Sequence, residues 1–156
     1  MLTIPQNVLV INALKPQTNA DALTGTYINL KTAHRAWVVF HMNQVDAAQA
    51  TLSLKKAMVV AGTDAVAVTE TFPIFANLDC DASDIFGRAA NAASYQLDVA
   101  LKTKLVVFQI DPEILGAYDC LAAVVGASNV ANLVSATYLI EPRYAEGENQ
   151  PSVLVD

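Results

Sequence analysis

The chain of 156 residues has the length of a single domain, long enough to bury a hydrophobic core without disulfide support. Only 15% of its residues are charged, 54% are hydrophobic, and the net charge at pH 7 is −6. This balance argues against a nucleic-acid partner, because phosphate binding needs clustered lysine and arginine side chains. It suits a protein whose surface is partly covered by other subunits.

The first 23 residues contain an apolar run at residues 8–11, which stops before Pro16. We expect this run to be an edge strand or part of an arm that reaches a neighbouring subunit, and we assign residues 1–23 to an N-terminal arm. Its expected contact residues are Leu2 and Ile4. The segment has no basic region followed by an apolar core, so we expect no signal peptide.

Residues 24–43 carry the clearest pattern in the chain. Thr26, Ile28 and Leu30 alternate with polar or aromatic residues, which predicts a strand with one buried face. Residues 36–40, Ala-Trp-Val-Val-Phe, are apolar at every position. We therefore predict a hairpin whose second strand is central, with a core on one face and a second layer or a partner subunit on the other.

The middle of the chain contains shorter alternating segments. Helical turns are predicted at residues 55–61, ended by Gly62, and at residues 85–93. Pro73 cannot donate a ladder hydrogen bond, so its strand is expected at a sheet edge or bulged there. Strands are predicted at residues 51–54, 66–75 and 95–101.

The last third holds a further strand at residues 105–110, apolar on both faces like the Trp37 strand. Asp111 is expected to cap a short helical turn beginning at Pro112. The uncharged run 120–140 is long enough to span a bilayer, but turn residues interrupt its middle, which favours two strands and a loop. About eight strands result, the spacing of an antiparallel sandwich or barrel.

No group of residues predicts catalysis, a cofactor or a metal. The acidic loop 77–84 begins like a calcium loop, but Ala82 replaces the required glycine and Arg88 the bidentate glutamate. His34 and His41 have no recognisable catalytic partner. A hydrolase with dispersed carboxylates is a remote alternative.

Two further residue pairs receive structural interpretations. Cys80 and Cys120 match no metal or disulfide spacing, which fits free thiols in a reducing cytoplasm. The basic doublets, residues 55–56 and the pair Lys102 and Lys104, are interpreted as solvated faces.

The C-terminal segment, residues 145–156, ends in three consecutive aliphatic residues, Val153, Leu154 and Val155. These side chains are better buried than solvated. We expect them to dock onto a neighbouring chain, with folding back onto their own domain as the alternative. The sandwich domain is accordingly assigned to residues 24–144.

The chain contains, in order, the segments TGTYINLKTAHRAWVVF, LSLKKAMVVAGTDAVAV, KLVVFQIDPEIL, YDCLAAVVGASN and ATYLIEPRY. From about residue 25 to residue 144, this order resembles small proteins encoded among the head genes of tailed bacteriophages, which are similar to capsid decoration, or cement, proteins. The resemblance implies an all-β, antiparallel sandwich of jelly-roll type, assembled as a dimer or trimer on the outer surface of an icosahedral head.

The resemblance further implies the major capsid protein as partner, assembly in the host cytoplasm, and no binding of nucleic acid or membrane. Another head-tail or tail structural protein is the alternative within that class. A carbohydrate-binding module is the alternative from a different class, because β-sandwiches often carry lectin sites. Its aromatic platform would come from the tyrosines, Tyr27, Tyr95, Tyr118 and Tyr138.

Overall fold

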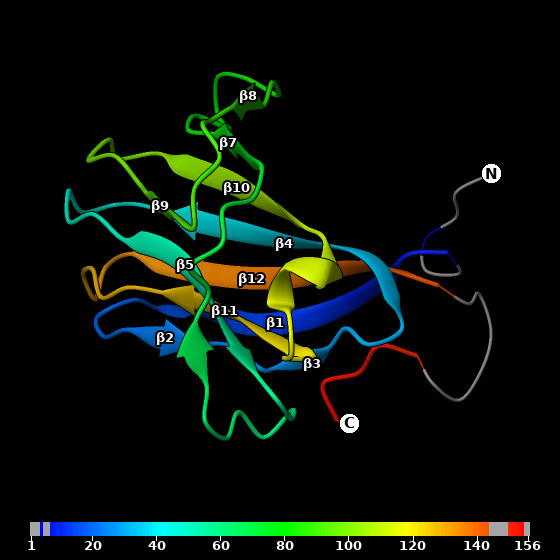
Figure 1. Ribbon diagram of the computed structural model, residues 1–156. Helices are drawn as coiled ribbons and strands as arrows, with labels where there is room; N and C mark the ends of the chain where they lie inside the picture. The colour runs from blue at the N-terminus through cyan, green and yellow to red at the C-terminus, as the bar shows by residue number, and fades with distance from the viewer. Residues whose placement is uncertain (1–3, 5–6, 144–149, 155–156) are drawn as a thin grey trace.

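The computed structural model describes residue 4, residues 7–143 and residues 150–154. These residues form two antiparallel β-sheets and one short 3-10 helix, η1 (Pro112–Leu115) (Figure 1). The predicted all-β sandwich is confirmed. The described residues form twelve strands rather than about eight, and several of these strands contain only two or three residues.

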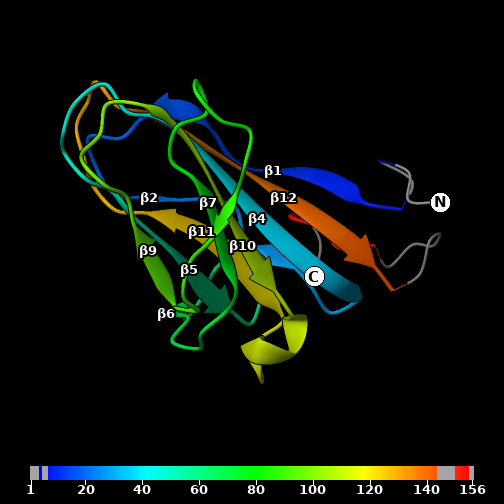
Figure 2. The same cartoon turned by 90° about the horizontal axis from the view of Figure 1, so that it is seen from above.

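Sheet A contains the long strands, in the order β1-β12-β4-β10-β7-β8. Their bounds are β1 Leu9–Thr18, β4 Ala33–Asn43, β7 Ile74–Asn77, β8 Gly87–Arg88, β10 Thr103–Ile110 and β12 Leu133–Pro142. As predicted for the Trp37 strand, β4 is central, since it pairs along its length with both β12 and β10. Figure 2 shows β1, β12, β4 and β10 together in one layer.

Sheet B is built from shorter strands, in the order β2-β11-β5-β6, with β3 also paired to β11 and β9 to β5. Their bounds are β2 Leu23–Thr24, β3 Ile28–Asn29, β5 Thr51–Ala57, β6 Val66–Ala67, β9 Ser94–Gln96 and β11 Cys120–Val125. The two strands predicted within residues 120–140 are confirmed as β11 and β12. They lie in different sheets, so the loop between them crosses from one layer to the other.

The core lies between the sheets and is centred on aromatic side chains. The ring of Phe108 lies 5.1 Å from the ring of Phe40 and 4.9 Å from that of Phe72, measured between centroids. Tyr138 reaches from β12 to sheet B, where its hydroxyl accepts a hydrogen bond from Ala123 N at 2.9 Å and donates one to Thr26 O at 2.7 Å. Tyr138 therefore ties the two layers together through the core.

Residues 24–26 link the two sheets at the β1 edge. Gly25 N donates to Ala123 O of β11 at 2.8 Å, and Thr26 N donates to Ala13 O of β1 at 2.9 Å. A Cβ atom at Gly25 would lie 2.5 Å from Ala13 O, closer than packed atoms approach. This crossing therefore requires glycine.

The predicted hairpin over residues 24–43 is wrong. β3 pairs with β11 in sheet B, whereas β4 lies in sheet A. The chain turns between them, with Ala33 N donating to Leu30 O at 2.9 Å. Ile28 and Leu30 are both buried in the core, so the alternating pattern reflects a short strand of sheet B followed by a crossing to sheet A.

Two predicted helical segments are also wrong. β5 continues as a strand to Ala57, because its residues pair with β11 and β6, and it ends in a turn at Gly62 with φ 73°. Residues 85–93 contain β8 instead of a helical turn. The predicted cap is confirmed, since Glu113 N donates to Asp111 Oδ1 at 3.1 Å at the start of η1.

Two predicted segments have different boundaries in the structure. Residues 9–11 of the apolar run belong to β1, an edge strand of sheet A, so the sandwich begins within the range assigned to an arm. The predicted strand 66–75 is split, with β6 in sheet B and β7 in sheet A. Pro73 lies between the two pieces, where it interrupts no ladder.

For the outer face of β4 we expected either a second layer or a partner subunit, and the described chain supplies no second layer. Its inward residues Val38, Phe40 and Met42 are buried. On its other face, Trp37 and Val39 are half-buried and His41 is exposed. No described layer of the chain covers this outer face of sheet A.

Candidate interaction surface

Four loops meet at one end of the sandwich, comprising residues 19–22, 44–50, 97–102 and 126–132, which we call the loop end (Figure 1). Backbone hydrogen bonds join them across long distances in sequence. Asn19 N donates to Asn132 O at 2.9 Å, Gln44 N to Lys102 O at 3.1 Å, and Leu97 N to Ala50 O at 3.0 Å. The loops are therefore parts of one structure.

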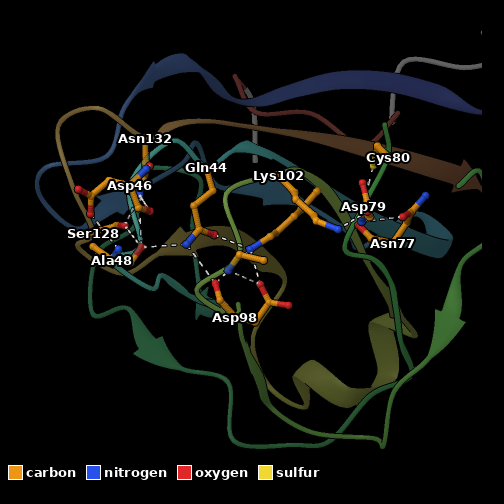
Figure 3. A network of polar contacts seen from close by, with 12 residues as sticks. Gln44, Asp46, Ala48, Asn77, Asp79, Cys80, Asp98, Lys102, Ser128 and Asn132 are labelled. Atoms are coloured by element: carbon orange, nitrogen blue, oxygen red, sulfur yellow. Dashed lines mark hydrogen bonds and ion pairs between the residues drawn. The ribbon is translucent and has the colours of Figure 1, made fainter. Parts of the chain in front are cut away.

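A buried lysine lies behind two of these loops, and its partners Gln44 and Asp98 are labelled in Figure 3. Lys104 is 1% exposed, and its Nζ donates to Gln44 Oε1 at 2.7 Å, to Asp98 Oδ1 at 2.6 Å and to Asp98 O at 3.0 Å. These three bonds engage all three ammonium protons, which leaves neither a lone pair for base catalysis nor a free donor. The arrangement positions loops and is unsuited to a reaction.

Electrostatics agree with this structural role. An unpaired cation in the core would be costly, but here a carboxylate and two amide oxygens surround it. The hydrogen bond from Lys104 holds the pKa of Asp98 below its usual value. The Asp98 side chain is 48% exposed, so water also solvates the pair.

The interpretation of the basic doublets as solvated faces is correct for Lys102 and wrong for Lys104. The Lys102 side chain is 43% exposed and pairs with Asp79. Lys104 instead lies on the inward face of β10, which also carries the buried Val106 and Phe108. This spacing of every second residue is the sequence signal that could have predicted the burial of Lys104. The interpretation as a solvated face is also wrong for Lys56, which is 8% exposed and whose Nζ pairs with Glu70 Oε1 at 2.5 Å.

Asn132, which sequence patterns placed only in a turn, organises the other half of the loop end (Figure 3). Its Oδ1 accepts from Val45 N at 2.9 Å and from Asp46 N at 2.8 Å. Its Nδ2 donates to Ser128 Oγ at 2.9 Å, and Ser128 Oγ in turn donates to Ala48 O at 2.7 Å. Asn132 is fully buried, so these bonds are shielded from water.

Large apolar side chains stand exposed on the same loops. The exposed fractions are 52% for Val45, 56% for Val99, 59% for Leu101 and 63% for Val130. Each of them lies one or two residues from a residue of the polar network. Exposed apolar side chains on a rigid support are typical of a docking surface, because little conformational freedom is lost on binding.

The described terminal contact residues, Ile4, Val153 and Leu154, lie away from the loop end, in different environments. Val153 packs against the core of its own domain, and Ser152 O accepts a hydrogen bond from Asn29 N at 2.8 Å. Residues 150–154 thus fold back along β3, the alternative considered for the tail. Ile4 is 63% exposed and Leu154 is 85% exposed, whereas Leu2 and Val155 lie outside the described residues.

A small cleft of about 130 Å³ lies beside η1. Its walls include Leu30, Leu115 and Tyr118 and the charged residues Lys31, Glu113, Asp119 and Arg143. Arg143 is tied to the backbone, since its Nε donates to Ala33 O at 3.0 Å. Lys31, Glu113 and Arg143 are exposed to solvent, and Asp119 is half-buried.

The other candidate groups are dispersed. In the described part of the chain, no three of the histidine, cysteine and acidic side chains are arranged to hold a metal ion. Neither Cys80 nor Cys120, both in the described part of the chain, is in a disulfide. Of the tyrosines considered for a carbohydrate platform, Tyr138 is fully buried and the others, Tyr27, Tyr95 and Tyr118, are half-buried.

No family model, curated protein or solved structure matches this chain. Within the residues that the structure describes, no helix is long and apolar enough to cross a membrane.

Proposed function

We propose that this protein is a structural component of a tailed-bacteriophage virion, a decoration protein that binds the outer surface of the assembled head. The observation that carries the proposal is the loop end, where four exposed aliphatic side chains are held by a buried polar network. Such a surface binds a partner through preorganised apolar contacts and performs no chemistry.

The order of sequence segments supports the choice of partner, because it resembles that of phage head proteins. A protein that binds only the assembled head stabilises that state by mass action. Many identical copies then make a modest affinity per site sufficient. The major capsid protein is the proposed partner, and the jelly-roll topology expected from the resemblance belongs to the same proposal.

Heads that lack this protein provide the direct test. Purified protein is added to them, and bound protein is quantified per major-capsid subunit together with the temperature at which the heads break open. We expect saturation at a fixed ratio and a higher breakage temperature. Binding to tails or connectors alone would place the protein elsewhere in the virion, and no binding to any virion part would refute the proposal.

Variants locate the contact. Leu101→Asp combined with Val130→Asp puts two charges on the loop end and is expected to weaken head binding at least about tenfold. Met58→Asp is the matched control, because Met58 is 53% exposed but lies in the turn after β5. Equal binding by both variants would show that another surface meets the head.

A further inference from the structure

The outer face of sheet A is unusually apolar for a sheet face that the described chain leaves uncovered. The strand registers align two rows of residues across it. One row contains Val10 of β1, Leu139 of β12, Trp37 of β4 and, at its end, Gln109 of β10. The next begins at Asn12 of β1 and continues through Thr137 of β12, Val39 of β4, Val107 of β10 and Phe75 of β7.

These side chains do not belong to the core between the sheets. Trp37, Val39, Val107 and Leu139 are half-buried among one another, and Val10 is 51% exposed. A solvated face of an antiparallel sheet normally carries polar residues at these alternate positions. The sequence therefore builds two apolar faces on sheet A, and only the inner one is covered by sheet B.

Charge is almost absent from this face. Along β12, β4 and β10, the only acidic residue is Glu141, and it lies directly opposite Arg35 of β4 at one end. The chain as a whole carries a net charge of −6. Two copies can thus approach through the centre of this face without bringing acidic side chains together.

The size of the face fits a protein interface. Four long strands spaced about 4.8 Å apart and about 30 Å long present a flat area of about 600 Å². A specific interface buries about 600–1,000 Å² on each partner. The face reaches this range before the corrugation of its side chains or the neighbouring β7 is included.

We propose that the outer face of sheet A binds the same face of a second copy, which forms a two-fold dimer. A two-fold axis places the centre of a patch against itself, and here the centre is the uncharged surface around Trp37 and Val39. Face-to-face sheets pack about 10 Å apart with interdigitated side chains, as in the sandwich itself. The inference goes beyond head binding, because it uses a different surface and leaves the loop end of each copy free.

Trp37 is the only tryptophan in the chain, so its fluorescence reports on this face alone. As the protein is concentrated, we expect its emission to shift to shorter wavelength and its quenching by iodide to fall. In parallel, the mass in sedimentation equilibrium should rise from 16.6 kDa to about twice that value. A mass of 16.6 kDa at every concentration, with constant emission, would overturn the proposal.

Variants separate this interface from others. Val39→Glu, and independently Thr137→Glu, place two like charges near the proposed axis and are expected to raise the dimer dissociation constant about 100-fold or more. Both positions face outward, and circular dichroism verifies that each variant is folded. Leu101→Asp at the loop end should leave the dimer intact.

The same variants distinguish this proposal from head binding. We expect Val39→Glu to be monomeric while each monomer keeps its loop end, and Leu101→Asp combined with Val130→Asp to be dimeric but defective on heads. A dimer that resists both glutamate variants would show that a different surface associates. A trimer would equally contradict a two-fold interface.

Discussion

Replacing the buried lysine with methionine, Lys104→Met, tests whether the polar network holds the loop end. The substitution keeps the apolar stem but removes the ammonium group and its three hydrogen bonds. The Asp98 carboxylate is 48% exposed, so water replaces its lost partner. Gln44 is 1% exposed, and its Oε1 is left without the charged donor.

The expected magnitude comes from the buried Gln44 Oε1. An unsatisfied buried acceptor costs about 1–3 kcal/mol, and apolar contacts of the buried methionine offset part of this cost, so we expect the free energy of unfolding to fall by about 2 kcal/mol. At this chain length the melting temperature should fall by about 4–8 °C. Urea unfolding measures this loss of stability, and the dependence of the free energy of unfolding on urea concentration should stay unchanged.

Lys102→Met is the matched control, because Lys102 directly precedes β10 and is also a lysine paired with an aspartate, but its side chain is 43% exposed. We expect it to cost less than about 1 kcal/mol. A pH series adds an independent readout. Since Lys104 lowers the pKa of Asp98, the stabilisation is present above the ordinary value of 3.8 and is lost as the pH falls below it. Equal losses for both variants, or a stable Lys104→Met protein, would refute the reasoning.

Three further predictions concern the core. Tyr138→Phe leaves Ala123 N and Thr26 O unsatisfied, and is expected to cost about 1–3 kcal/mol in chemical unfolding; a loss below about 0.5 kcal/mol would contradict the tie between sheets. Burial raises the pKa of Tyr138 above its ordinary value of 10.0, so its stabilisation is full below that pH and is lost above it. Unfolding measured between about pH 9 and pH 11 should therefore show a shallower loss for Tyr138→Phe than for the wild type. Gly25→Ala forces a contact with Ala13 O and should cost about 1–3 kcal/mol; a wild-type melting temperature would show that the crossing relaxes freely.

The strands with two apolar faces could be predicted from the sequence, because a run of apolar residues is visible without knowing which strands lie beside it. The segments that became β4 and β10 are apolar at nearly every position, and both lie inside sheet A. The Asp111 cap was predictable for the same reason, since its hydrogen bond spans only two residues.

Pairing between strands was not predictable in this way. A polar turn after Leu30 suits both a hairpin and a crossing between sheets, and the choice depends on β11, about 90 residues further along the chain. Similarly, β6 and β7 form one alternating pattern in sequence, although they belong to different sheets.

The candidate site was missed because it is assembled from distant segments. Val45 and Val130 are isolated valines in two polar loops, whereas Val99 was assigned to the predicted strand 95–101, of which only residues 95 and 96 lie in β9. Hydrogen bonds between residues far apart in sequence, among them those of Gln44 and Asn132, bring these loops together. The sequence instead drew attention to the aliphatic tail, where consecutive residues share an obvious character.

Hydrogen–deuterium exchange of the protein, free and bound to heads, tests the central claim most directly. If the loop end is the docking surface, amides in residues 44–50, 97–102 and 126–132 should gain protection on binding, while the turn containing Met58 should exchange as before. Protection confined to residues 150–154 or to the outer face of sheet A, with unchanged exchange in these three loops, would contradict the account.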